Sequence, residues 1–167
     1  MRHRKERLTM DVDINIFVWM SRTASLPFET TLRVRDCCLC LHVQRAARTL
    51  ARRFDEALRP LGLTNGQFSL LMSLNRPEPA GMASVSSLLG MDRTTLTAAL
   101  KPLERRHLVT VSRDPSDRRG RRLSLTANGK TLLASAVPVW EQTHLQVTES
   151  LPNGDVDSLL RGLREIS

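Results

Sequence analysis

Apolar residues recur at helical spacing along most of the chain. From Thr31 to Leu58 they keep a period close to that of the α-helix, which predicts one long helix. Pro60 and Gly62 are expected to end this helix, because proline cannot continue a helix and glycine favours its C-terminal turn. The apolar stripe of the predicted helix consists of Val43, Ala47, Leu50, Phe54, Leu58 and Leu61.

Two shorter helices are predicted next. Thr64 followed three residues later by Gln67 is a capping-box pattern that starts a helix, and the loop 75–81, which contains two prolines, ends it. The apolar residues of this helix are Phe68, Leu70, Leu71, Met72 and Leu74. A short helix is expected over 82–89, before a turn at Gly90. Its inward-facing residues are expected to be Val85, Leu88 and Leu89.

The following segment predicts an amphipathic helix from Arg93 to Arg106, with Asp92 as its N-cap. One face carries Leu96, Leu100 and Leu103, and the opposite face carries Thr94, Thr97, Ala98 and Lys101. Small polar side chains let a helix backbone approach base edges in the major groove, and a cation suits phosphate. Taken alone, the pattern also fits an ordinary amphipathic surface helix.

A β-hairpin is predicted after this helix. The segments 108–113 and 121–126 alternate apolar and polar residues, and the residues between them include Asp114, Pro115 and Gly120, which favour turns. Five arginines stand against two aspartates between positions 113 and 122. Arginine at a hairpin tip suits the narrow, strongly negative minor groove. Short helix, turn, second helix and hairpin together predict a winged helix-turn-helix.

Two more helices are predicted towards the C-terminus. Thr126 is expected to cap a helix over 127–150 that Pro138 bends, and a last amphipathic helix is expected over 155–165. These helices and the first long one carry apolar stripes that need a partner, which favours a homodimer. Residues 1–30 are expected to be an N-terminal extension. The alternative is a short helix around 14–20 that packs on a partner subunit.

Composition narrows the class of protein. The 167 residues amount to one domain, and the net charge of +8 favours a polyanionic partner such as nucleic acid. Aromatic residues make up 4% and tyrosine is absent, which argues against a base-stacking platform for single strands or RNA. No apolar run is long enough to span a membrane. Three cysteines without a convincing signal peptide predict reduced thiols and a cytoplasmic protein.

Three segments resemble the MarR family of dimeric winged-helix transcription factors: LRPLGLTNGQFSLL at 58–71, LLGMDRTTLTAALKPLERRHLV at 88–109 and RDPSDRRGRRLSLTANG at 113–129. The resemblance implies a mainly α fold with a small β-hairpin wing and a helical dimerisation region. It places the MarR-type domain at 31–167, after the extension over 1–30. Within this domain, 31–62 and 127–167 would form the dimerisation helices, and 63–126 the DNA-binding winged helix.

The resemblance also implies roles for single residues. Arg118 would enter the minor groove, and Asp117 and Arg119 would brace the wing by charge pairing. Ala98 stands where some relatives carry a base-reading arginine, so their operator preference does not carry over. The residues expected to contact DNA are Arg93, Thr94, Thr95, Thr97, Lys101, Arg113, Arg118 and Arg119.

Cys40 and Cys37 are the candidates for an effector site. On one continuous helix Cys40 shares the apolar stripe, Cys37 lies one turn before it, and Cys38 points nearly opposite. Cys40 lines up with the reactive cysteine of the OhrR branch of the family, although Gln44 and Phe54 replace the tyrosines that support it there. The open alternatives are an organic ligand in the crevice between the dimer and DNA-binding parts, or no effector, with Cys40 as a small packed hydrophobe.

The sequence therefore predicts a dimeric repressor of a pseudo-palindromic double-stranded DNA operator, relieved by thiol oxidation or by a small molecule. We expect no enzyme activity and no cofactor, because no nucleophile, base and orienting residue group together in the sequence. We expect no metal site, because no third ligand accompanies Cys37 and Cys40. We also expect no membrane association, because the apolar runs are short. Two alternatives remain at this point. One is a small thiol peroxidase or oxidoreductase using Cys37 and Cys40, and the other is a protein-interaction module that has lost DNA binding.

Overall fold

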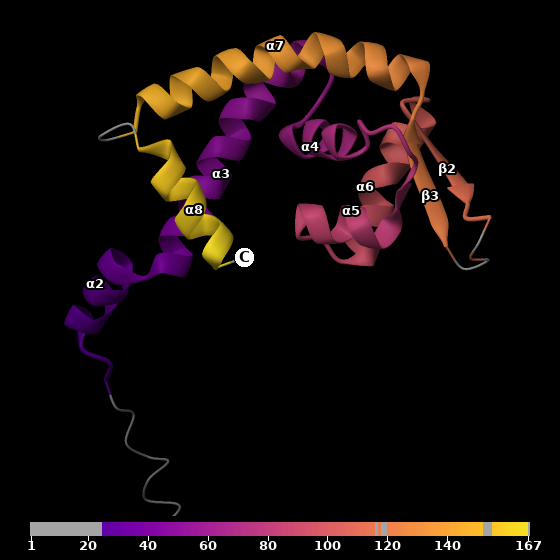
Figure 1. The fold of residues 1–167 in the computed structure, drawn as a ribbon. Helices are drawn as coiled ribbons and strands as arrows, with labels where there is room; N and C mark the ends of the chain where they lie inside the picture. Colours follow the sequence, from indigo (N-terminus) through magenta and orange to yellow (C-terminus); the bar gives the residue numbers. More distant parts are fainter. Residues whose placement is uncertain (1–24, 116, 118–119, 152–154, 167) are drawn as a thin grey trace, which may run out of the picture. The chain divides into compact units, whose positions relative to one another are not determined.

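The computed structural model of the chain describes residues 25–115, 117, 120–151 and 155–166. It divides into a first unit that extends to Val43 and a second that begins at Gln44, and each is described by itself. The described part is mainly helical with one small antiparallel sheet, as the sequence predicts (Figure 1). None of its helices combines the length and the apolar character needed to cross a bilayer.

The first unit contains helix α2, Phe28–Cys37, and the start of helix α3, Leu39–Leu58. The single helix predicted over 31–58 is wrong, because Cys38 is extended, at φ −74° and ψ 104°, and separates the two. Neither proline nor glycine marks this break, so the helical spacing of apolar residues continues across it. The predicted helix 14–20 lies outside the described residues.

Local capping signals set the helix boundaries of the second unit. A 3-10 turn, η1, Arg59–Leu61, follows α3 and ends at Gly62, whose φ of +65° is left-handed. The predicted capping box at Thr64 then starts helix α4, Asn65–Ser73. Helix α5, Met82–Leu89, ends at Gly90, which is also left-handed at φ +61°. Helix α6, Arg93–Arg105, continues through Pro102.

The core of the second unit gathers side chains from α3, α4, α5, α6, α7 and the sheet. Phe54 and Leu58 of the predicted α3 stripe are buried, whereas Leu50 is exposed. The predicted apolar face of α6 is also confirmed as buried. The largest fully buried side chains are Leu58, Leu70, Leu71, Leu96, Leu103, Leu123 and Val85.

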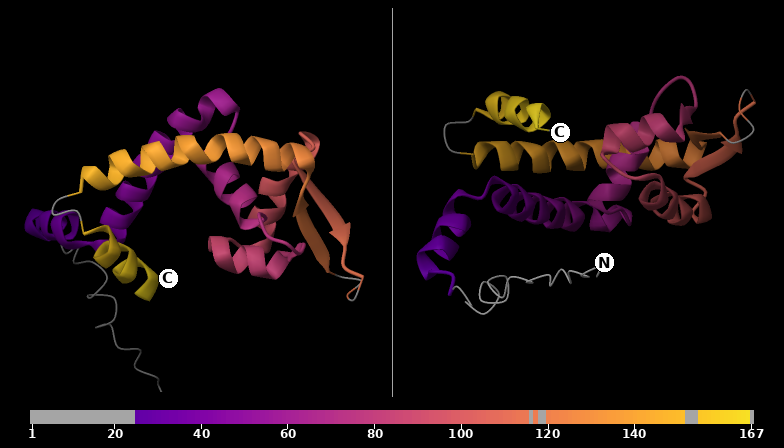
Figure 2. Two further views of the ribbon diagram at one scale, coloured as in Figure 1. Left: turned by 45° about the horizontal axis from the view of Figure 1, so that its top comes forward. Right: turned by 90° about the horizontal axis from the view of Figure 1, so that it is seen from below.

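Three strands form the sheet in the order β1-β3-β2. Strands β2, Val109–Arg113, and β3, Arg121–Leu125, form the predicted hairpin, with Val111 opposite Leu123. Strand β1, Ala80–Gly81, pairs with β3 and was not expected, because two residues are too few to show an alternating pattern. The hairpin projects from the N-terminal end of helix α7, Ala127–Glu149 (Figure 2).

Helix α7 begins at the predicted N-cap, Thr126, and continues through Pro138. It is gently curved (Figure 1). Helix α8, Val156–Glu165, begins at Asp155, whose carboxylate accepts the Ser158 N–H at 2.9 Å. Both helices carry large apolar side chains that a single chain leaves exposed. They include Leu145, Leu159 and Leu160.

Candidate nucleic-acid interface

The start of α6 is fixed by Asp92. One carboxylate oxygen accepts the Thr95 N–H at 2.8 Å, and the other accepts the Thr95 hydroxyl at 2.6 Å. The hydroxyl bond is the main reason why the pKa of Asp92 lies below its usual value. The carboxylate thus satisfies a free N–H of the first turn, at the helix end where negative charge is favourable.

This cap predicts a dependence of stability on acid pH. Because the folded-state pKa of Asp92 is lowered, its contribution is present above the unfolded-state pKa and is lost as pH falls through the folded-state value. Asp92→Asn, which keeps a capping oxygen, should flatten the fall in stability between neutral and acid pH relative to the wild type. Urea unfolding at a series of pH values measures this, and parallel curves for the two proteins would contradict it.

The predicted DNA-facing side of α6 is exposed: Arg93, Thr94, Thr97, Ala98 and Lys101 all face solvent. Two of the threonine hydroxyls are already engaged within the protein. Thr95 donates to Asp92, and Thr97 donates to the backbone oxygen of Arg93 at 2.7 Å. Among the described residues, Thr94 is therefore the threonine of this face whose hydroxyl has no hydrogen bond within the chain.

A groove of about 270 Å³ lies between α6 and the hairpin. It brings Arg93, Thr97 and Lys101 of the helix together with Arg121 of β3. Its other lining residues are Met82, Leu100, Glu104 and Val111. Arg121 was not among the candidates from the sequence, where it was one member of a charged run. Three cations against one carboxylate give this groove the charge that binds phosphate.

Two arginines face each other at the end of the hairpin. Arg113 on β2 is the cross-strand partner of Arg121 on β3, and both are exposed. Like charges directly opposite each other destabilise an antiparallel pair. A bound polyanion would remove this cost, because it would neutralise both guanidinium groups. Arg118 and Arg119, predicted for the wing tip, lie outside the described residues, and Asp117 is exposed beside them.

A second arginine of β3 braces the turn end of the hairpin. Arg122 forms an ion pair with Asp114 at 2.7 Å, and the Asp114 side chain is only 12% exposed. Arg122 also donates to the backbone oxygen of Pro79 at 3.3 Å. In the sequence Asp114 does not differ from the other turn residues, nor Arg122 from the other arginines, so this ion pair could not be predicted. The brace joins the wing to the loop that enters β1.

The three cysteines lie where α2 gives way to α3. Cys37 is the last residue of α2 and Cys40 the second residue of α3; both are exposed, and Cys38 between them is half-buried. The geometry expected on one continuous helix is therefore wrong, because the extended backbone at Cys38 interrupts it. The exposure of Cys40 also disagrees with its alternative role as a buried hydrophobe.

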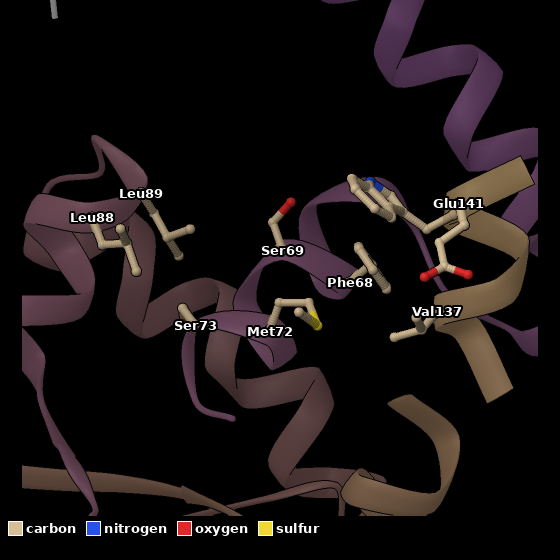
Figure 3. A pocket seen from close by; sticks show the side chains of 9 residues that line it. Phe68, Ser69, Met72, Ser73, Leu88, Leu89, Val137 and Glu141 are labelled. Carbon is tan, nitrogen blue, oxygen red and sulfur yellow. The ribbon is translucent and has the colours of Figure 1, made fainter. Parts of the chain in front are cut away.

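An apolar pocket of about 560 Å³ lies between α4, α5 and α7 (Figure 3). Phe68 and Met72 of α4 face Val137 and Glu141 of α7, and two leucines of α5 close the other side. The prediction that Leu88 points inward is wrong, because its side chain is 63% exposed and lines this pocket. Only Val85 of that helix is fully enclosed by the core.

Comparisons with known proteins agree with this geometry. Residues 63–120 match the model of the MarR family. The organic hydroperoxide resistance transcriptional regulator of Bacillus subtilis is 30% identical over 101 residues, which cover 60% of this chain and 69% of that protein. The transcriptional regulator SarZ of Staphylococcus epidermidis is 28% identical over 94 residues. That match covers 56% of this chain and 64% of the length of SarZ.

A solved structure extends the similarity over most of the chain. The transcriptional regulator MOSR of M. tuberculosis, crystallised in complex with DNA, is 39% identical, with a TM-score of 0.71. The match covers 77% of this chain and 92% of that one.

Proposed function

Because the chain belongs to the MarR family, we propose that it is a sequence-specific, double-stranded DNA-binding transcriptional regulator, and a repressor. The observation that carries the proposal is the groove in which Arg93 and Lys101 of α6 meet Arg121 of the hairpin. The relatives of this chain are transcriptional regulators, not enzymes, which argues against the alternative of a thiol peroxidase. Such a regulator would act on DNA in the cytoplasm.

In this proposal α6 enters a major groove, with Arg93, Thr94 and Lys101 towards bases and phosphates. The wing enters the flanking minor groove, and Arg118 and Arg119 are the residues proposed to contact DNA there. The opposed pair of Arg113 and Arg121 supports a phosphate contact at the turn end of the hairpin, since the pair is unfavourable without an anion. Thr95 and Thr97 would act mainly by fixing the first turns of the helix.

A homodimer on a pseudo-palindromic operator completes the proposal. The large apolar side chains of α3, α7 and α8 that remain exposed support it, since a second copy would cover them: Leu50, Leu145, Leu159 and Leu160. Two copies related by a twofold axis would place their α6 helices in successive major grooves, about one helical turn apart. Residues 31–62 and 127–167 would then provide the dimer contacts.

Relief of repression would come from thiol oxidation or from a small-molecule ligand. The exposure of Cys37 and Cys40 supports access by an oxidant. A hydroperoxide would oxidise the Cys40 thiol to a sulfenic acid and would itself be reduced to the alcohol. Operator binding before and after hydroperoxide treatment, in wild type and Cys40→Ser, tests this mechanism. Identical responses of the two proteins would exclude a role for Cys40.

The DNA interface is tested by Arg121→Ala. Loss of a phosphate contact should weaken operator binding by about tenfold and make the slope of log affinity against log salt shallower by about 1. Fluorescence anisotropy with a labelled operator at several salt concentrations measures both quantities. Arg76→Ala, which removes an exposed arginine of the loop after α4, is the matched control and should leave both nearly unchanged. Unaltered affinity in Arg121→Ala would remove this residue from the interface.

A further inference from the structure

We propose that the pocket between α4, α5 and α7 binds a lipophilic cation, held by its apolar walls, its aromatic rings and the carboxylate of Glu141. This deepens the proposed function by giving a place and a chemical class to a small-molecule effector. Its regulatory part rests on the proposed function, whereas binding itself can be tested without DNA.

The size and lining of the pocket suit an organic molecule. Its volume of about 560 Å³ lies within the range of small-molecule sites, roughly 300–1,000 Å³. Six of its nine lining residues are apolar: Phe68, Met72, Leu88, Leu89, Val137 and Trp140. Of the two serines, Ser73 already donates its hydroxyl to the backbone oxygen of Leu70 at 2.7 Å. The walls therefore favour an apolar body with few hydrogen-bonding groups.

The charge of the pocket selects between ligand classes. Glu141 is the charged residue among those that line it, and neither lysine nor arginine accompanies it there. Within the described part of the chain, Glu141 forms no hydrogen bond or ion pair. In Figure 3 its carboxylate lies on the same side of the pocket as Phe68 and Val137. An unpaired negative charge beside apolar walls attracts a cation and repels an aromatic carboxylate.

Aromatic rings strengthen the preference for a cation. The rings of Phe68 and Trp140 are stacked, with centroids 6.1 Å apart, and the imidazole of His144 stacks on Trp140 at 4.9 Å. Aromatic faces carry negative potential, and organic cations are commonly recognised by such rings together with a nearby carboxylate. Met72, with its polarisable sulfur, adds an adaptable side chain to the lining of the pocket.

The position of the pocket links it to the DNA interface. Met72 and Leu88 are 41% and 63% exposed, so two large apolar side chains at this site are left for a ligand to cover. Helix α5, which carries Leu88, leads through Gly90 into α6 and packs against it. A molecule lodged between α5 and α7 would therefore bias the orientation of α6, and with it the affinity for DNA.

Two probes of matched size and opposite charge test the ligand class: tetraphenylphosphonium and tetraphenylborate. The chain contains two tryptophans, so Trp19→Phe in the full-length protein leaves Trp140, which lines the pocket, as the fluorescent reporter. We expect saturable changes in fluorescence at lower concentrations of the cation than of the anion. Tighter binding of the cation would point to the pocket, because the net charge of +8 favours binding of the anion at non-specific sites.

Two substitutions locate the site. Glu141→Gln should weaken binding of tetraphenylphosphonium about three- to tenfold and reduce the preference for the cation, whereas Glu149→Gln, on the same helix but outside the pocket, should not. Leu88→Lys places a cation in the lining at an exposed position and should abolish binding. Equal affinity of wild type and Glu141→Gln, or unchanged binding in Leu88→Lys, would overturn the proposal.

The effect of the bound cation on regulation is measured as a change in the affinity for operator DNA. Tetraphenylphosphonium should lower the affinity of the wild type for operator DNA but not that of Leu88→Lys. Binding of the cation without any effect on DNA affinity would overturn the regulatory role and leave the site. If the wild type fails to bind any DNA selected from random fragments, the proposed function fails, while the fluorescence titrations still decide the ligand class.

Discussion

Gly129→Ala is expected to destabilise the protein by about 2–4 kcal/mol, because a Cβ atom at this position would collide with the backbone oxygen of Leu108. The same Cβ would lie 3.0 Å from the carbonyl carbon of Leu108, so backbone rather than a flexible side chain would have to move. Thr126 holds the junction between the hairpin and α7 by hydrogen bonds in both directions. Its N–H donates to the backbone oxygen of Leu108, and its hydroxyl donates to the backbone oxygen of His107. The same hydroxyl accepts the Gly129 N–H at 3.0 Å.

Gly66→Ala is the matched control for this prediction. Gly66 lies in the first turn of α4, and a Cβ there would meet no atom within 4 Å. Alanine should therefore stabilise the protein by about 0.5–1 kcal/mol, because it lowers the conformational entropy of the unfolded chain. Urea unfolding of the two variants measures the difference. Similar free energies of unfolding for Gly129→Ala and wild type would show that the junction between hairpin and α7 adapts readily.

Helix starts and the hairpin could be predicted from the sequence because their causes are local. Thr64, Asp92 and Thr126 each accept a backbone N–H three residues further on, as their residue types and positions indicate. The alternation along 109–113 and 121–125 likewise follows from one buried and one exposed face of the same strands. Such signals need only a few neighbouring residues.

Other features depend on contacts between distant segments. Strand β1 exists because Ala80 and Gly81 pair with residues of β3, and two residues carry no periodic signal of their own. Leu88 continues the apolar pattern of α5, but the core lies against Val85 and leaves Leu88 exposed. The break at Cys38 has no proline or glycine to announce it.

The sequence predicts that the candidate interface is rich in basic residues, but it does not predict which of them lie together. The sequence shows Arg121 and Arg122 as equal members of one basic run. Successive residues of a strand point to opposite faces, and the structure separates these two accordingly. Arg121 lies in the groove with Lys101, whereas Arg122 is paired with Asp114 and bonded to the Pro79 carbonyl. Their substitution should therefore have different physical consequences.

Asp114→Asn is expected to weaken operator binding by roughly tenfold, although it removes a negative charge from a surface proposed to meet DNA. Simple electrostatics predicts the opposite sign, since less repulsion of phosphates would strengthen binding. The ion pair explains the expectation, because the nearly buried carboxylate of Asp114 holds Arg122 at 2.7 Å and thereby ties the wing to the loop at Pro79. Loss of the pair leaves the wing less well ordered before it binds.

The control for charge is Glu78→Gln. Glu78 is exposed beside Pro79, so its loss should strengthen DNA binding slightly or leave it unchanged. Fluorescence anisotropy over a range of salt concentrations distinguishes the effect of charge from the effect of the lost ion pair.

Asp114→Asn should lower the affinity without making the salt slope shallower, because no cation is lost from the interface. The double variant with Arg122→Ala should lose less affinity than the sum of the two single losses, because the ion pair couples the two residues. Tighter binding by Asp114→Asn would mean that the carboxylate acts on DNA only through its charge. Additive losses in the double variant would mean that Asp114 and Arg122 act through separate contacts.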